Sequence, residues 1–95
     1  LNSLSLEGNQ ITNLPECIGD LINLEYLTLY HNQLMNLPES IGNLSDLRFL
    51  RLYNNQLTSI PESIGNLSSL EVLYLQENQL NGMISDNICE LNNKI

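Results

Sequence analysis

Apolar and polar residues follow one another along this chain in a pattern that returns every 23 residues. Leucine fills the fourth and sixth positions of each 23-residue repeat, so two leucines point to one side of an extended segment while their neighbours point to the other. A fixed internal period of this length indicates a repeat architecture. Each period opens at a leucine: Leu1, Leu24, Leu47 and Leu70. The chain, 1–95, is therefore predicted to be a single stack of units at 1–23, 24–46, 47–69 and 70–93, with 94–95 as the start of a further unit or a tail.

An asparagine stands at the ninth position of every unit, shortly after the extended segment. The four residues are Asn9, Asn32, Asn55 and Asn78. The side-chain amide of asparagine offers both donors and an acceptor to a turning backbone. Stacked one per unit, these amides are predicted to form a ladder that satisfies buried peptide groups.

The second half of a unit reads as a short helical turn. Proline, which suits the first position of such a turn because its missing N–H would be unpaired there, recurs as Pro15, Pro38 and Pro61. Inward-pointing isoleucines follow as Ile18, Ile41 and Ile64. Glycines come next, where a left-handed residue would close the turn, as Gly19, Gly42 and Gly65. No unit can bury its own apolar face, so the units must stack, with parallel strands about 4.8 Å apart.

The shared frame, LxxLxLxxNxLxxLPxxIGxLxx, resembles the leucine-rich-repeat family over essentially the whole chain. The resemblance implies an α/β fold: a right-handed solenoid, or horseshoe, with a parallel β-sheet on the concave side and short helical turns on the convex side. It also implies a protein-interaction module that presents its concave sheet to a protein partner.

The fourth unit departs from this frame. It has one extra residue before Ile88, and it carries Gly82, Ser85 in the place of proline, and Cys89 in the place of glycine. The stretch LNGMISDNIC looks like the LxGxIPxxI variant of plant receptor-type leucine-rich repeats. A degenerate terminal unit explains the same departures and is the preferred interpretation.

The two ends of the chain carry the apolar frame without a polar capping segment. Terminal repeats normally need a polar outer face, and an unpaired strand edge invites pairing with another chain. Two interpretations stay open. The chain is a fragment of a longer array, which we prefer, or copies stack end to end as a self-assembling structural filament. A third hypothesis, a piece of an extracellular recognition or receptor ectodomain, comes from the fourth unit and from two glycosylation sequons.

The surface is strongly acidic, with a net charge of −8. Such a charge repels phosphate backbones and anionic lipid, so neither nucleic acid nor a membrane surface is an expected partner. No apolar run approaches the roughly 18 residues of a membrane helix. The sequons begin at Asn43 and Asn66 and occupy the same position in consecutive units. The compartment stays open between cytoplasm and exterior.

The repeat register assigns the second, third, fifth, seventh and eighth positions to the concave side. All five aromatic residues, both arginines and the single histidine fall on these positions: Tyr26, Tyr30, His31, Arg48, Phe49, Arg51, Tyr53 and Tyr74. Tyrosine and arginine are enriched at binding hot spots, so this set is predicted to be a partner footprint centred on units two and three. The alternative is that aromatic residues simply favour strands.

The same register predicts which of these side chains are neighbours. Tyr26 should lie beside Phe49 and Tyr30 beside Tyr53, while Arg51 should make a cation–π contact with a tyrosine of the next unit, Tyr74. The concave acids are available to pair with the arginines or with a partner: Glu7, Glu25, Glu71 and Glu77. Acids in the first helical turn suit the helix dipole and are expected to be structural: Glu16, Glu39 and Glu62.

Catalytic and cofactor chemistry is not expected. One histidine and scattered carboxylates give no metal-ligand spacing, and no nucleophile motif surrounds His31. Neither GxxxxGK[ST] nor GxGxxG occurs. Cys17 and Cys89 are predicted to lie three strand spacings apart, about 14 Å, which is too far for a disulfide.

Overall fold

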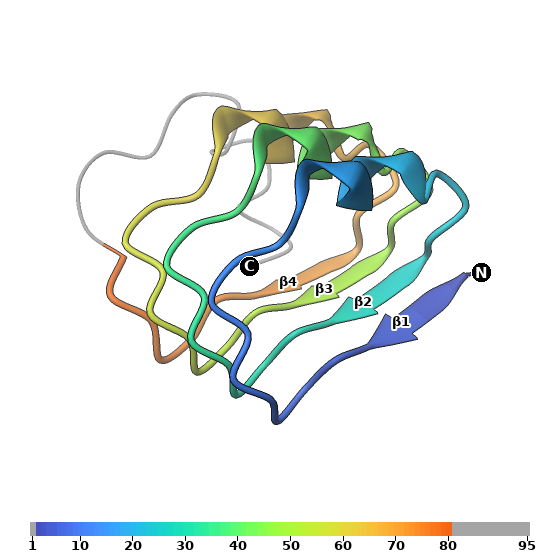
Figure 1. The fold of residues 1–95 in the computed structure, drawn as a ribbon. Helices are drawn as coiled ribbons and strands as arrows, with labels where there is room; N and C mark the ends of the chain where they lie inside the picture. The colour runs from blue at the N-terminus through green and yellow to red at the C-terminus, as the bar shows by residue number, and fades with distance from the viewer. Residues whose placement is uncertain (1, 81–95) are drawn as a thin grey trace.

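The computed structural model describes residues 2–80. Its four strands form one parallel sheet in the order β1-β2-β3-β4: β1 (Ser3–Ser5), β2 (Tyr26–Thr28), β3 (Phe49–Arg51) and β4 (Val72–Tyr74). Each of the first three strands is followed by a 3-10 helix: η1 (Glu16–Asp20), η2 (Glu39–Asn43) and η3 (Glu62–Asn66). Figure 1 shows the strands side by side along one wall of the molecule and the 3-10 helices stacked along the opposite wall. The predicted solenoid with a parallel sheet is confirmed.

The strand register follows from the leucine pattern. Parallel pairing places Leu4 beside Leu27, Leu27 beside Leu50, and Leu50 beside Leu73, so equivalent residues of consecutive units are always neighbours. A slip of one residue would turn these leucines to solvent, because side chains alternate between the two faces of a strand. The burial of the leucine set therefore fixes the register.

The hydrophobic core fills the space between the sheet and the 3-10 helices. Leucines of the first, fourth and sixth positions of units two and three are completely buried: Leu24, Leu27, Leu29, Leu47, Leu50 and Leu52. Ile18, Ile41 and Ile64 reach the same core from the 3-10 helices, as predicted. Each fully buried side chain of this size contributes roughly 1.5–3 kcal/mol relative to an exposed one. The first unit is more open, since Leu4 and Leu6 are only partly buried.

The prolines stand one residue before the helical turns. Pro15, Pro38 and Pro61 have extended backbone, with φ between −69° and −73°. The carbonyl of Pro15 accepts a hydrogen bond from the amide of Ile18 at 3.0 Å, and the equivalent bonds in the next two units measure 3.1 Å. Proline thus starts the turn through its carbonyl, while its lack of an N–H costs nothing there.

The expected left-handed conformation at Gly19 and Gly42 is wrong. Neither has a positive φ, whereas Gly8 does, at 73°. Glycine is needed because the backbones of neighbouring turns touch. A Cβ atom on Gly19 would lie 2.6 Å from the carbonyl oxygen of Ser40, and one on Gly42 would lie 2.5 Å from that of Ser63.

Left-handed backbone occurs instead at the eighth position of every unit, just beyond the strand. The residues are Gly8 (φ 73°), His31 (57°), Asn54 (59°) and Glu77 (57°). A side chain in this region costs about 1–2 kcal/mol, least for asparagine. A hydrogen bond to the next unit stabilises this left-handed turn: the amide of His31 donates to the carbonyl of Tyr53 at 3.2 Å.

A row of serine hydroxyls joins the 3-10 helices. The Oγ of Ser40 donates to the carbonyl of Glu16 at 2.6 Å, and the Oγ of Ser63 donates to that of Glu39 at 2.7 Å. Cys17 holds the equivalent position in the first unit and is exposed. The serine at this position therefore links each 3-10 helix to the preceding one through a hydrogen bond.

Replacing Ser40 by alanine is expected to lower the free energy of unfolding by about 1 kcal/mol, the usual contribution of one hydrogen bond. Urea denaturation followed by circular dichroism measures the change. Ser45→Ala is the control, because Ser45 is exposed and its hydroxyl makes no hydrogen bond within the described chain. Equal stability of the two variants would contradict a joining role for Ser40.

The predictions for the end of the fourth unit, including Gly82, Ser85 and Cys89, and the predicted separation of Cys17 from Cys89, lie outside the described residues. Within residues 2–80, no helix has the length and apolar character that crossing a membrane requires.

Candidate binding surface

The asparagine amides support the sheet from its carboxyl end. Asn55 Nδ2 donates to the carbonyls of Leu29 and Leu52, both at 3.0 Å, while its Oδ1 accepts from the amide of Leu34 at 3.0 Å. Asn32 and Asn78 make the equivalent three bonds, one within their own unit and two to the unit before it. Each amide thus bridges two consecutive units. Asn9 is exposed and bonds only to carbonyls of its own unit, those of Leu6 and Glu7.

Two stacked pairs of rings lie on the side of the sheet that faces away from the core, which we call the sheet face. Tyr26 stacks on Phe49 with ring centroids 5.2 Å apart and an interplanar angle of 16°. Tyr30 stacks on Tyr53 at 4.4 Å and 8°. The parallel register places equivalent positions of neighbouring strands side by side, so rings one unit apart in sequence become stacking partners. All four rings are half-buried, and none belongs to the core.

Two further rings extend the second stack. Tyr74 turns its edge to Tyr53 at 6.3 Å, and 40% of Tyr74 is exposed. His31 makes edge contacts with Tyr30 at 5.1 Å and Tyr53 at 5.7 Å. The side-chain amide of Asn54 also contacts His31 Nδ1. Tyr30, His31, Tyr53 and Tyr74 therefore form one ring cluster.

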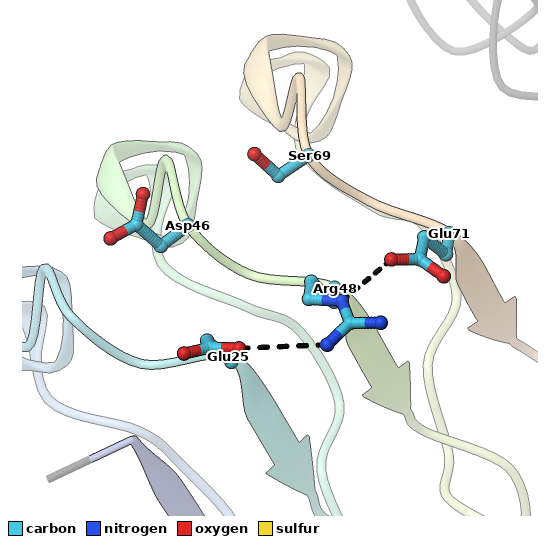
Figure 2. A pocket seen from close by; sticks show the side chains of 5 residues that line it. All are labelled: Glu25, Asp46, Arg48, Ser69 and Glu71. Atoms are coloured by element: carbon cyan, nitrogen blue, oxygen red, sulfur yellow. Dashed lines mark hydrogen bonds and ion pairs between the residues drawn. The ribbon is translucent and has the colours of Figure 1, made fainter.

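Arg48 is held by an acid on each neighbouring strand, as Figure 2 shows. Its Nε donates to Glu71 Oε2 at 2.6 Å, and its Nη1 lies 3.6 Å from Glu25 Oε1. Nη1 also donates to the hydroxyl of Tyr26 at 3.1 Å. The carboxylate of Glu71 raises the pKa of the Arg48 guanidinium, so this side chain is a permanent cation. Arg48 thus links the acidic edge of the sheet to the first ring stack.

Arg51 does not make the expected contact with Tyr74. Its guanidinium carbon lies 5.5 Å from the ring centroid of Phe49 instead. The third and fifth positions of one strand point to the same face, so the long side chain of Arg51 folds back onto the ring of its own strand. Register pairs Arg51 with Tyr74 across the sheet, but it does not fix where either side chain turns.

A shallow depression lies where β2, β3 and β4 begin. Its lining residues are Glu25, Asp46, Arg48, Ser69 and Glu71 (Figure 2). Small-molecule sites are usually concave and mostly apolar, with a few polar groups. This depression is polar, and Arg48 occupies its centre between two carboxylates. It therefore forms the charged rim of the sheet face rather than a separate pocket for a small molecule.

The surroundings of Tyr53 in the ring cluster keep its phenol neutral. Burial, and then the neighbouring Tyr30, raise the pKa of Tyr53 above its ordinary value of 10.0. Tyr53 thus offers a ring and a hydroxyl donor at neutral pH, and it is not poised for acid–base work. Among residues 2–80, no three histidine, cysteine, aspartate or glutamate side chains gather as metal ligands would.

The family is decided by a match over nearly the whole chain. The family model described as "Leucine-rich repeat region" matches residues 1–93. This chain belongs to the leucine-rich-repeat family. No match is found among curated proteins.

Solved leucine-rich-repeat structures share the fold. A leucine-rich-repeat protein of Leptospira interrogans is 44% identical, with a TM-score of 0.90, over 99% of this chain and 24% of that one. The PEPR1–AtPEP1 structure is 41% identical (TM-score 0.76) over 83% of this chain and 12% of that one. The BIR3–SERK2 complex of Arabidopsis thaliana is 32% identical (TM-score 0.84) over 98% and 52%. The chain thus spans about half the length of these relatives or less.

The structure brings the eight predicted footprint residues onto the sheet face in two groups. The first group is Tyr26, Arg48, Phe49 and Arg51, and the second is the ring cluster. The sequons lie elsewhere: Asn43 and Asn66 are exposed at the ends of η2 and η3. Sequence reasoning missed the contact of Asn54 with His31, although the one-unit spacing of these two residues was a signal for it.

Proposed function

We propose that this leucine-rich-repeat segment is a non-catalytic interaction module whose concave sheet face binds a protein partner, with the two ring stacks on and just beyond β2 and β3 at the centre of the contact. The observation that carries the proposal is the pair of ring stacks that lie outside the core. They cover the sheet face with half-exposed aromatic area, which the fold does not need for its own burial.

Stacking prepares these rings for binding. Aromatic side chains bury large areas with few rotatable bonds, and ordering side chains on binding normally costs about 0.5–1.5 kcal/mol each. Tyr30 and Tyr53 are already held against each other, and His31 supports both of their edges. Binding of a partner therefore costs little further side-chain entropy at these rings. More of the free energy gained from the contact then appears as affinity.

The relatives support the partner class. One of the similar structures is a complex, that of BIR3 with SERK2, and another, PEPR1–AtPEP1, carries the names of two molecules. Both match this chain over most of its length with TM-scores of 0.76 and 0.84. A module of the same fold with an aromatic sheet face is suited to the same general task, the binding of a polypeptide.

The experiment that tests the proposal compares two double variants in affinity capture from the cells that make the protein, followed by calorimetric titration of the captured partner. Tyr30→Ala with Tyr53→Ala is expected to weaken binding at least about tenfold, as truncation at a hot spot does. Ile22→Ala with Met35→Ala is the matched control, because these side chains are 58% and 56% exposed and lie outside the strands. Unchanged affinity of the tyrosine variant, with its circular dichroism spectrum intact, would refute the sheet-face contact.

A further inference from the structure

We propose that the partner segment carries a lysine or arginine side chain that seats between the ring of Tyr30 and the carboxylate of Glu7. This inference rests on the proposed function, and it names the chemistry that the sheet face selects.

The seventh positions of the first three units form the row that makes this seat. They are Glu7, Tyr30 and Tyr53, each two residues beyond the end of its strand, after β1, β2 and β3. Tyr53 covers one face of the Tyr30 ring, with centroids 4.4 Å apart and nearly parallel planes. The other face of Tyr30 therefore points along the row toward the first unit. Glu7 stands there in the place of a third ring, one strand spacing away, about 4.8 Å.

Both walls of this seat attract a cation. The face of an aromatic ring carries negative potential, and a cation over it gains about 0.5–1 kcal/mol at an exposed site. Glu7 is exposed, and its carboxylate makes no ion pair within residues 2–80. Its charge contributes to the raised pKa of Tyr53, which places it in the field of the ring cluster. A partner's ammonium or guanidinium group would therefore meet a ring face on one side and a carboxylate on the other.

The chain's own cations are committed to other contacts. Arg48 is paired with Glu71 and Glu25, and Arg51 lies over Phe49. Both arginines stand on or beside β3, so the β1–β2 half of the sheet face stays acidic. Their positive charges would repel a partner's cation from the β3 half. The seat at Tyr30 is thus the part of the described ring surface that a basic side chain can approach without repulsion.

The body of the protein favours the same partner. A net charge of −8 attracts a basic segment and repels an acidic one over a distance of about one Debye length, roughly 8 Å at physiological salt. A single carboxylate beside a ring lacks the several oxygen ligands that a bare metal ion needs. A cationic polypeptide side chain is the occupant that fits both the ring and the charge.

The test selects binders from a phage library of random peptides on the full chain and measures them by a double-mutant cycle. Selected peptides are expected to be enriched in lysine and arginine relative to the library. For a synthetic copy of the tightest binder, Glu7→Gln should weaken binding about fivefold. The same change should have no effect once the basic residue of the peptide is replaced by glutamine. Glu39→Gln, which removes the same charge from η2 on the opposite wall, is the matched control and should leave affinity unchanged.

The outcomes separate this inference from the proposed function. Enrichment of basic residues together with coupling to Glu7 supports the seat. If Tyr30→Ala and Tyr53→Ala weaken binding but the peptides are neutral or acidic, or show no coupling to Glu7, the inference is wrong and the sheet-face function stands. If the tyrosine variant also binds as well as the parent chain, both are wrong. An equal effect of Glu39→Gln would assign the preference to net charge alone and overturn the seat.

Discussion

Replacing Asn55 by alanine is expected to lower the free energy of unfolding by about 3 kcal/mol. Asn55 is 6% exposed, and its amide makes three hydrogen bonds of 3.0 Å, two of which join its unit to the unit before it. Alanine would leave the amide of Leu34 without its partner, while the carbonyls of Leu29 and Leu52 would each lose one bond and keep one, from Asn32 and Asn78. Each buried group left unsatisfied costs about 1–3 kcal/mol, and water entering the gap would offset part of the total.

The control for this prediction is Asn9→Ala, the same substitution at the same position of the first unit. Asn9 is exposed and donates only within its own unit, so about 1 kcal/mol or less is expected. Guanidinium denaturation followed by circular dichroism compares the two variants, with equal m-values as the check on two-state behaviour. Equal losses at the two positions would show that the bridge between units contributes no stability.

Replacing Gly42 by alanine is expected to cost about 2–3 kcal/mol, the range for an added methyl group that forces backbone shifts. The new Cβ would lie 2.5 Å from the carbonyl oxygen of Ser63 and 2.6 Å from its Cβ. Both of these atoms are fixed by the fold, so η2 and η3 must move apart. That movement would also lengthen the hydrogen bond from Ser63 to the carbonyl of Glu39. The change in thermal midpoint measures the loss.

Gly8→Ala separates crowding from backbone strain. Gly8 has a φ of 73° and nothing within 4 Å of the position a Cβ would take. Its substitution should cost only the left-handed penalty of about 1 kcal/mol. A smaller loss at Gly42 than at Gly8 would contradict the close approach of the 3-10 helices.

The order and register of the strands could be predicted from the sequence, because a single requirement determines both. The leucines two residues apart must face one core in every unit, and the 23-residue period then makes equivalent leucines neighbours, as Leu27 and Leu50 are. The same logic gave the stacking of Tyr30 on Tyr53. A pattern that repeats in phase predicts which residues are adjacent, since adjacency depends only on the strand register.

Features that depend on the path of the backbone could not be predicted from the sequence. Gly42 and Gly8 are the same residue type, yet one is needed for space and the other adopts a positive φ. Glu77 shares the left-handed backbone of Gly8, His31 and Asn54, although glutamate is not typical of it. The tertiary hydrogen bonds of the turn outweigh the local preference there.

The direction in which a long side chain turns could not be predicted from the sequence either. Register placed Arg51 beside Tyr74, and the side chain turns to Phe49 instead. Several ring faces lie within reach of an arginine, and the choice among them depends on rotamers and on neighbours such as Glu71 and Glu25, which hold the other arginine. The composition of the candidate site was therefore predictable, while its internal contacts were not.

The core and the proposed binding contact lie on opposite sides of the sheet. Leu27 and Leu29 point into the core, whereas Tyr26 and Tyr30 lie on the sheet face. Truncation of a sheet-face ring should therefore change affinity with a smaller effect on folding than truncation of a core leucine, which costs about 2–5 kcal/mol. This separation makes the sheet face testable by substitution.

An NMR titration of the chain with its captured partner tests directly whether the sheet face binds that partner. The side-chain signals of Tyr26, Tyr30, Tyr53 and Tyr74 report on the sheet face, and the methyl signals of Ile22 and Met35 report on exposed apolar surface outside the strands. We expect the tyrosine signals to shift or broaden on binding while the two methyl signals stay in place. Movement of the Ile22 and Met35 signals with unchanged tyrosine signals would contradict binding at the sheet face.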